Sequence, residues 1–268
     1  GYQVLPTMAK WLKGKIYEVP LTKQNQYLPN LESIPVEIYQ KTKIFLVNYP
    51  NSPTGAIATK EFYAQLLKKA KQYGFLIVND CVYGPLTYHT EPLSIFSIPD
   101  SENYCIEVHS LSKAFNMTGF RIGFMVANEK LMHILKEVKD NMDSGQYIPI
   151  QYAAMKAFEN ESHTLPQLKE HYYRRLTQVA AILNKHHLYC KVPEATFYLY
   201  VQVPSTFKTA EDFALYLLYQ AGIYTIPWDE AEPAVRFAMT YSIQTTEHDF
   251  LVELDRRLSH LSFFEKKE

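Results

Sequence analysis

The sequence has little of several features that mark specialised classes of protein. Among 268 residues there are nine glycines, two tryptophans and three cysteines, and the formal net charge is −1. No apolar run is long enough to span a membrane, and lysines are spread along the chain without a basic excess. We therefore expect neither a membrane nor a nucleic-acid partner. The length and a hydrophobic content of 47% suit a compact soluble protein of one large domain or two smaller ones.

The cysteines and histidines show no pattern of a disulfide framework or a metal site. Cys81, Cys105 and Cys190 are odd in number and lie in apolar, strand-like segments, so we expect reduced core thiols in a cytoplasmic protein. The nine histidines lack a spacing such as H-E-x-x-H, and no metal is expected. No G-x-G-x-x-G follows a predicted strand, which argues against a dinucleotide site. No signal peptide is visible, but the chain opens on Gly1 without a methionine, so a missing upstream segment is expected.

The first half of the chain alternates strand and helix signals. Buried strands are predicted at 43–48, 75–79, 104–109 and 122–127, with a shorter strand at 15–19. Helices are predicted at 7–13, 34–40 and 60–73, the last with Thr59 as its N-cap and Gly74 as its end. This alternation predicts an α/β fold with a mostly parallel sheet and helices on both faces. Ligands bind at the carboxyl ends of the strands in such sheets, where the loops at Ser52, Asp80 and Lys113 fall.

The second half of the chain has a different pattern. Helices are predicted at 127–140, 152–160, 166–186, 211–221 and 247–261, and strands at 197–203, 223–227 and 235–242. The change after the long helix predicts a smaller C-terminal α+β domain. We therefore divide the chain into a large domain, residues 1–165, and a connector helix with the small domain, residues 166–268.

One stretch, residues 110–123, concentrates polar chemistry between two predicted buried strands. It reads Ser110-Leu-Ser112-Lys113 and continues to Arg121. Burial lowers the pKa of a lysine because it disfavours the ammonium form, and such an amine can form an imine with an aldehyde. Arg121 and Ser110 are residue types that hold a phosphate. An amine beside a phosphate seat indicates pyridoxal phosphate, the cofactor whose aldehyde bonds a lysine.

A second polar pair follows the predicted strand 75–79 as Asp80-x-x-Tyr83. A pyridine ring becomes an electron sink when its nitrogen is protonated, and a buried carboxylate stabilises that cation. Asp80 is the candidate for this role, and Tyr83 is a candidate donor to the phenolate oxygen of the ring. The alternative is an aspartate that caps a turn and a tyrosine that belongs to the core.

The S-x-S-K sequence, followed eight residues after its lysine by R-x-G, resembles the cofactor-lysine segment of fold-type I pyridoxal-phosphate-dependent aminotransferases of class I/II. Residues 138–146 resemble a segment common in the aspartate, alanine and LL-diaminopimelate branch of this family, and Asp80 and Tyr83 stand where the family has its D-x-x-Y pair. The resemblance implies that Lys113 bonds the cofactor and moves the substrate proton. It also implies that Ser110, Ser112 and Arg121 bind the cofactor, and that Tyr2 stacks on its ring.

Two further positions resemble family residues, one of them with a departure. Asn51-Ser52-Pro-Thr-Gly is similar to the family's N-P-[TL]-G turn, but serine stands where the family has asparagine. Either Ser52 reaches the cofactor through a water, or Asn51 substitutes for it by a local shift. Arg236 in the predicted strand 235–242 resembles the arginine that binds the substrate α-carboxylate, for which a planar guanidinium is suited.

The resemblance implies an aminotransferase that moves an amino group between an amino acid and a 2-keto acid. It also implies a homodimer in which each subunit contributes to the other's active site. Two alternatives stay open: a carbon–sulfur lyase or decarboxylase of the same fold, and a degenerate relative without catalysis. The sequence does not identify the amino donor.

Overall fold

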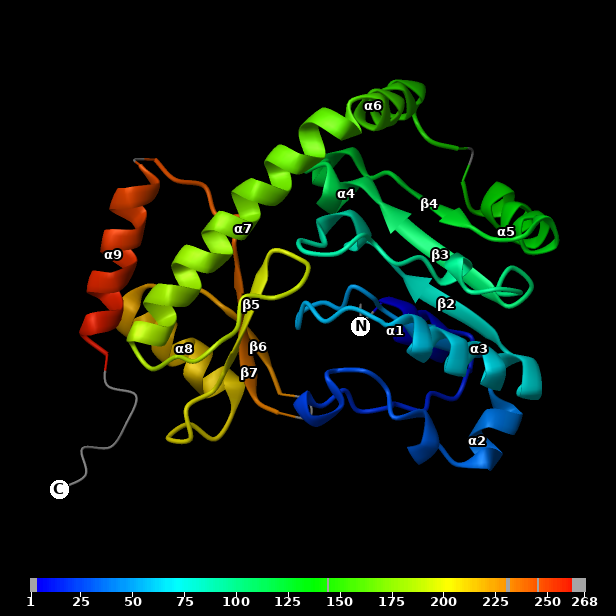
Figure 1. Ribbon diagram of the computed structural model, residues 1–268, viewed down its shortest axis with the longest axis horizontal. Helices are drawn as coiled ribbons and strands as arrows, with labels where there is room; N and C mark the ends of the chain where they lie inside the picture. The colour runs from blue at the N-terminus through cyan, green and yellow to red at the C-terminus, as the bar shows by residue number, and fades with distance from the viewer. Residues whose placement is uncertain (1–3, 144, 230–231, 245, 262–268) are drawn as a thin grey trace.

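The computed structural model describes residues 4–143, 145–229, 232–244 and 246–261 (Figure 1). Two β-sheets form its framework, a four-stranded sheet of order β1-β2-β3-β4 and a three-stranded sheet of order β5-β7-β6. The strands of the first sheet are Ile44–Val47 (β1), Leu76–Asp80 (β2), Cys105–Ser110 (β3) and Gly123–Val126 (β4). Those of the second are Tyr198–Gln202 (β5), Ile226–Trp228 (β6) and Ala234–Ala238 (β7).

The helices connect and cover these sheets. They are Val4–Trp11 (α1), Val36–Lys41 (α2), Lys60–Tyr73 (α3), Leu111–Ala114 (α4), Glu129–Met142 (α5), Ile148–Glu159 (α6), Glu161–Lys185 (α7), Ala210–Ala221 (α8) and Glu247–Ser259 (α9). Figure 1 shows α7 extending from α6, on the side of the first sheet, to α8 and α9 beside the second. Within the described residues, no helix is long and apolar enough to cross a membrane.

The first sheet confirms the predicted α/β architecture. Strands β1, β2 and β3 are parallel, with Leu46 opposite Val78 and Val78 opposite Ile106. The intervening helix α3 has the predicted ends: the Thr59 hydroxyl accepts the N–H of Phe62 at 3.1 Å, and Gly74 closes the helix at φ +74°. A positive φ of this kind strains residues that have a Cβ, so the glycine stops the helix before β2 begins.

Two predicted strands are wrong in whole or in part. The strand predicted at residues 15–19 does not form: within the described chain these residues are irregular, mostly exposed and paired with no strand. The segment predicted at 122–127 is a strand, β4, but it is antiparallel to β3 and lies at the edge of the sheet. Phe124, Met125 and Val126 are 40–43% exposed, so both faces of β4 are open. An apolar run does not distinguish an edge strand from a central one.

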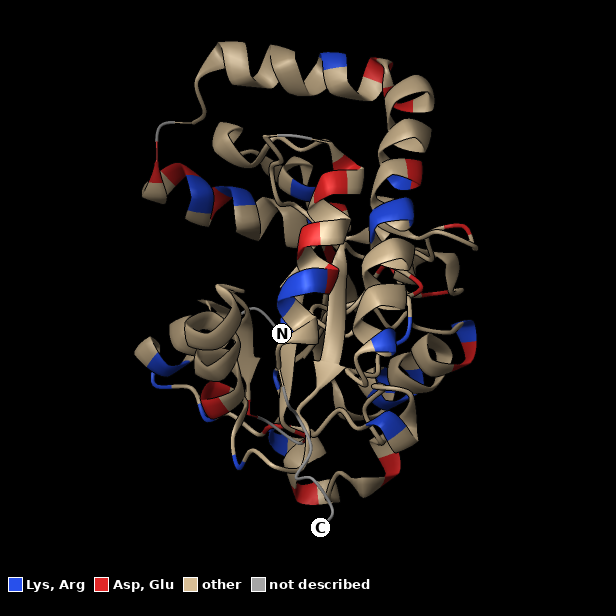
Figure 2. Ribbon diagram, turned by 90° about the vertical axis from the view of Figure 1, so that its left-hand side faces the viewer, with Lys and Arg blue, Asp and Glu red and all other residues tan. Residues whose placement is uncertain are grey.

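The chain has two main hydrophobic cores. One lies among β1, β2, β3, α2 and α3, and the other among α7, α8, α9, β5 and β7. The second core also buries Tyr83 and Leu86 from the loop that follows β2. That loop therefore joins the end of the first sheet to the second core, where the candidate site lies. Charged side chains of both signs are interspersed along the helices (Figure 2), in line with the net charge of −1.

Candidate active site

The carboxyl ends of the three parallel strands bring the predicted residues to one edge of the first sheet. The turn with Asn51 and Ser52 follows β1, Asp80 ends β2, and the segment with Lys113 follows β3. Tyr2 lies outside the described residues. The remaining predicted residue, Arg236, comes from β7 in the other sheet.

Asp80 has a buried carboxylate with one oxygen that lacks a partner. The residue is 8% exposed, and its Oδ1 makes no hydrogen bond within the described chain. Burial raises the pKa of the carboxyl above its ordinary value of 3.8. The N–H of Val82 and the nearby charges of His109 and Lys113 act in the opposite direction. Such an oxygen is suited to accept a hydrogen bond from a cationic N–H group of a bound ring.

Tyr83 is held between a serine and a second tyrosine. Its hydroxyl donates to the hydroxyl of Tyr198 at 3.1 Å, and the neighbouring Ser52 side chain acts to lower the pKa of Tyr83. Burial and the neighbouring Tyr198 raise the pKa of Tyr83 well above its ordinary value, so the phenol stays protonated. Ser52 and Tyr83 thus form a pair of hydroxyls near the ends of β1 and β2.

Asn51 points into the turn itself. It is 2% exposed, and its Oδ1 accepts the Thr54 hydroxyl at 2.6 Å. Its N–H donates to the carbonyl of Ala56 at 2.8 Å, so both groups are engaged within the turn. Gly55 has φ +73°, and a Cβ there would lie 2.3 Å from the Cβ of Pro193, which only glycine avoids. The turn consequently presents Ser52, and not Asn51, to Tyr83.

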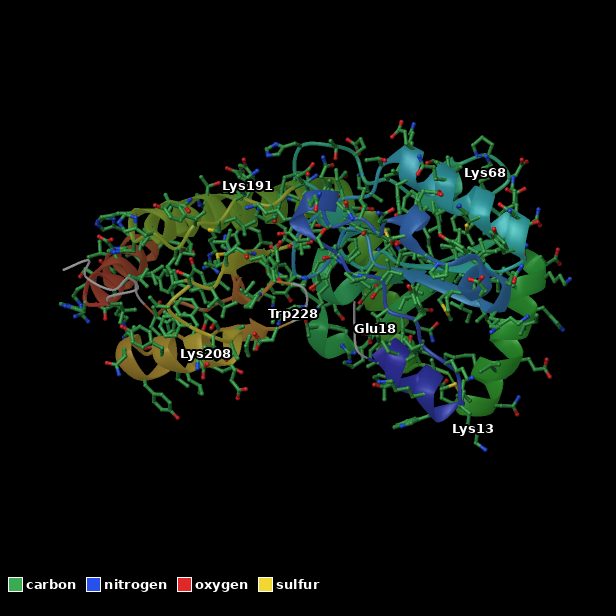
Figure 3. All side chains as sticks on the ribbon, turned by 90° about the horizontal axis from the view of Figure 1, so that it is seen from below. Lys13, Glu18, Lys68, Lys191, Lys208 and Trp228 are labelled. Carbon is green, nitrogen blue, oxygen red and sulfur yellow. The ribbon has the colours of Figure 1, made fainter. Side chains whose placement is uncertain are left out.

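Lys113 lies in the short helix α4 directly after β3. The lysines labelled in Figure 3, Lys13, Lys68, Lys191 and Lys208, are exposed on the outside of the molecule. Lys113 in contrast is half-buried, and its amine makes no hydrogen bond or ion pair with any described residue. The helix α4 packs against the 3₁₀ turn Gly84–Leu86 that follows Tyr83. The charge of Lys113 acts to lower the pKa of Asp80, so the amine lies within electrostatic reach of that carboxyl.

Ser110, Ser112 and Arg121 converge at the start of α4. The Ser110 hydroxyl accepts the N–H of Ser112 at 3.1 Å and so caps the helix. Arg121 has a positive φ of +52°, and its Nη1 donates to the Thr118 carbonyl at 2.9 Å and reaches the Ser112 hydroxyl at 3.4 Å. The carbonyl of Arg121 in turn accepts the Gln146 side chain at 2.9 Å. A guanidinium, two hydroxyls and backbone N–H groups are the donors that an anion requires.

Arg236 lies in β7 and contacts Tyr198 of the neighbouring strand β5. Its guanidinium carbon lies 4.3 Å from the centre of the Tyr198 ring, which places the cation over the aromatic face. Its Nε is buried and, within the described chain, has no hydrogen-bond partner. A planar guanidinium with an unused donor is suited to bind a carboxylate. Tyr198 therefore touches both Arg236 and Tyr83.

Tyr198 is a site residue that was not predicted, and an unusual turn places it. Thr196 precedes it with φ +71°, a conformation that β-branched residues rarely adopt. The N–H of Thr196 donates to the Leu86 carbonyl at 3.1 Å, and its hydroxyl accepts the N–H of Tyr198 at 3.3 Å. The sequence predicts a strand at 197–203, but nothing in the sequence pairs Tyr198 with Tyr83.

Comparison with known proteins is consistent with this arrangement. The sequence profile of "Aminotransferase class I and II" matches residues 1–249. The LL-diaminopimelate aminotransferase of Methanocaldococcus jannaschii is 42% identical over 96% of this chain and 65% of its own length. That of Methanococcus maripaludis is 38% identical over 98% of this chain and 66% of its own length. The chain thus spans about two thirds of the length of these curated relatives.

Solved structures show the same fold. BacF from Bacillus subtilis in its apo form has a TM-score of 0.91 at 30% identity, over 99% of this chain and 68% of BacF. An aminotransferase from Staphylococcus aureus has a TM-score of 0.88 at 28% identity, over 97% of this chain and 68% of the other. With a profile that matches most of its residues, the chain belongs to the class I and II aminotransferase family.

Proposed function

We propose that the chain is the major part of a pyridoxal-phosphate-dependent aminotransferase that moves an amino group between an amino acid and a 2-keto acid. The observation that carries this proposal is the buried Asp80 carboxylate, whose Oδ1 has no partner in the described chain, beside the unpaired amine of Lys113. A buried acceptor and an unpaired amine are costly for a fold unless a ligand uses them. Family membership supports the same reading.

The residues present fit the cofactor. Asp80 would accept the N–H of the ring nitrogen. The Tyr83 hydroxyl, which donates to Tyr198 in this structure, would turn its proton toward the ring oxygen, with the Ser52 hydroxyl beside it. Ser110, Ser112 and Arg121 would hold the phosphate, with Asn51 supporting the turn from inside. Of the two alternatives for the family's asparagine, the geometry favours Ser52, because the Asn51 oxygen already accepts the Thr54 hydroxyl. Tyr2 is proposed as the stacking residue from the resemblance alone.

Pyridoxal phosphate supplies an aldehyde and an electron sink when it is bound. The chain's own residues would then orient the substrate and move its proton. Arg236 would bind the α-carboxylate through its unused Nε, which fixes the amino acid relative to Lys113. The Lys113 amine would take the proton from the α-carbon and deliver it to the carbon that was the cofactor's aldehyde. Burial of Tyr83 keeps its hydroxyl a donor throughout.

The substrate is proposed from the relatives. Several curated relatives are named LL-diaminopimelate aminotransferase, so LL-diaminopimelate is the first candidate donor. The test is a screen of amino acids, LL-diaminopimelate included, against the cofactor-loaded protein, with its absorbance spectrum as the readout. Bleaching of the cofactor band with release of the matching keto acid supports the proposal. A keto acid formed without transfer of the amino group to an acceptor would indicate a lyase, and an unchanged band with every donor would refute the proposal.

We further propose a homodimer of cytoplasmic protein. Apolar side chains on α1, β4, α5 and α6 are exposed in the isolated chain, among them Trp11, Met142 and Tyr152, which is unusual for a monomer. The three cysteines are free, in keeping with a reducing compartment. The two hydrophobic cores support the proposed division into residues 1–165 and 166–268. Size-exclusion chromatography with light scattering tests the dimer.

A further inference from the structure

Asn48 is a buried amide that touches two of the proposed cofactor-binding residues. It follows the last residue of β1 and is 7% exposed. Its Nδ2 donates to the carbonyl of Asp80 at 2.8 Å, and its Oδ1 accepts the N–H of Ser52 at 2.9 Å. One side chain thus links the end of β2 to the turn that follows β1.

A second amide makes the reciprocal link. Asn79, directly before Asp80, is fully buried, and its Oδ1 accepts the N–H of Tyr49 at 3.2 Å. Its Nδ2 lies 3.0 Å from the Tyr63 hydroxyl and 3.3 Å from Glu107 Oε1. The Asn79 bonds lead into the core beneath the sheet, whereas both Asn48 bonds end on Asp80 and Ser52. Replacing Asn48 would therefore disturb the site with less damage to the core than replacing Asn79.

The two residues that Asn48 joins lie at opposite ends of the proposed ring site. Asp80 would meet the ring nitrogen, and Ser52 with Tyr83 would meet the ring oxygen. The β1–β2 ladder ends at the pair Val47 and Asn79, so no ladder bond fixes the spacing beyond it. The Asn48 side chain adds one more hydrogen bond between the two chain segments, beyond the last backbone pair of the ladder.

We propose that Asn48 is a positioning residue that sets the spacing between Asp80 and the Ser52–Tyr83 pair. The inference rests on the proposed function, since the spacing matters only if a rigid ring lies between these groups. A rigid ring can make both contacts at once only when the distance between the two protein groups matches the width of the ring. A misplacement of about 1 Å can lower a rate about a hundredfold. The amide performs this role without touching the cofactor.

The test uses Asn48→Ala and the isosteric Asn48→Asp in the cofactor-loaded protein. Asn48→Asp keeps an acceptor for the Ser52 N–H but loses the donor to the Asp80 carbonyl. The matched control is Asn184→Ala, because Asn184 is also bonded at both ends: Nδ2 to the Cys190 carbonyl at 3.1 Å and Oδ1 to the Cys190 N–H at 2.9 Å. Asn184 lies in the last turn of α7, away from the site.

Each variant is measured for thermal stability, for the pH midpoint of the bound cofactor's absorbance, and for kcat and KM. We expect Asn48→Ala to lower kcat about tenfold to a hundredfold and to move the absorbance midpoint. Asn184→Ala should lower Tm without either effect. A lowered Tm with unchanged midpoint and kcat in both Asn48 variants would overturn the inference. If Asn48→Ala does not fold, Asn48→Asp is judged by the same two quantities.

A double-mutant cycle with Ser52→Ala separates positioning from general damage. If Asn48 acts through Ser52, the Ser52→Ala substitution should lower kcat less in the Asn48→Ala variant than in the parent. Additive losses would contradict the inference. A parent protein that shows no cofactor band would refute the proposed function and this inference with it. A normal parent whose Asn48 variants behave like Asn184→Ala would refute this inference alone.

Discussion

The hydroxyl of Tyr83 donates to the hydroxyl of Tyr198 at 3.1 Å, joining the loop after β2 to strand β5 of the other sheet. The ring of Tyr198 also carries the guanidinium of Arg236 over its face, at 4.3 Å. One tyrosine consequently connects the proposed cofactor-binding group with the proposed carboxylate-binding group. The two halves of the proposed site are physically coupled through this residue.

Replacing Tyr198 by Phe should therefore act on the cofactor end of this pair more than on the substrate end. The variant loses the hydroxyl that accepts the Tyr83 proton but keeps the ring under Arg236. We expect a shifted pH midpoint of the cofactor absorbance and a KM for the amino acid within about threefold of the parent, since an aromatic face is retained. Tyr198→Leu, which removes the face as well, should raise KM. Equal KM values for the two variants would contradict the proposed contact.

Lys113 should be the lysine that bonds the cofactor. Its amine is half-buried and, in the described chain, unpaired, unlike the exposed lysines at the surface. Borohydride reduction of the loaded protein followed by peptide mapping should label Lys113. Lys113→Arg, which keeps a cation, should abolish the label while the fold is retained in circular dichroism. Label on any other lysine of the parent would refute the assignment.

Asp80→Asn should stabilise the cofactor-free protein while it slows the reaction. Burial raises the pKa of Asp80 above its ordinary 3.8, so the fold disfavours the ionised form. The loss of folding stability caused by ionising Asp80 is absent below about pH 3.8. It grows as the pH rises through the raised pKa of the folded protein and is fully present at neutral pH. The variant should then gain on the order of 1 kcal/mol at pH 7 and nothing at low pH.

The same Asp80→Asn variant should lose about a hundredfold or more in transamination rate, because the ring nitrogen loses its anionic partner. The stability gain of Asp80→Asn is measured by thermal melts of the cofactor-free protein across pH. The control is Asp100→Asn, at an exposed position. Asp100 pairs with Lys71 at the surface, so its replacement should change little. A rate within about tenfold of the parent would show that Asp80 is structural.

Arg236→Lys should weaken amino-acid and keto-acid binding together. The guanidinium offers a planar fork and an unused Nε, whereas an ammonium offers a single point of charge. We expect KM to rise at least about tenfold for both substrates, with the cofactor spectrum unchanged. Loss of cofactor with retained substrate affinity would mean that Arg236 serves the cofactor instead.

Much of this arrangement is predictable from sequence because it depends on local signals. Helix α3 begins and ends where Thr59 and Gly74 indicate, and the three parallel strands lie where the apolar runs are. The edge position of β4 was not predictable, since exposure depends on neighbours that the segment itself does not encode. The polar stretch around Lys113 and the D-x-x-Y pair were visible as patterns before any contact was known.

The missed residues share one physical property: their roles come from contacts between distant parts of the chain. Tyr83 meets Tyr198 across 115 positions, and Asn48 meets the Asp80 carbonyl across 32. No local spacing distinguishes such residues from ordinary core positions. The choice between Asn51 and Ser52 likewise depends on which side chain makes its hydrogen bonds within the turn, and this is visible only in the geometry of that turn.

Glu107 gives the last prediction, which concerns stability and not catalysis. It is 2% exposed on β3, and its carboxylate accepts the N–H of Ile95 at 2.7 Å and the hydroxyl of Ser94 at 2.9 Å. It also lies 3.4 Å from the His109 ring nitrogen and 3.3 Å from the Asn79 amide. Burial alone would raise the pKa of Glu107, but these hydrogen bonds outweigh it and hold the pKa below its ordinary 4.5.

A lowered carboxyl pKa contributes stability that is present above pH 4.5 and is lost as the pH falls through the folded value. Glu107→Gln should therefore be less stable than the parent by about 1.5–3 kcal/mol at pH 7, and the difference should shrink below about pH 4. The control is Glu32→Gln, because Glu32 forms an exposed pair with Lys69 at 3.1 Å and should matter by less than about 1 kcal/mol. Denaturant unfolding from pH 3 to pH 8 measures both variants. Parallel stability profiles for the parent and Glu107→Gln would show that folding does not lower the pKa of Glu107 and would contradict the prediction.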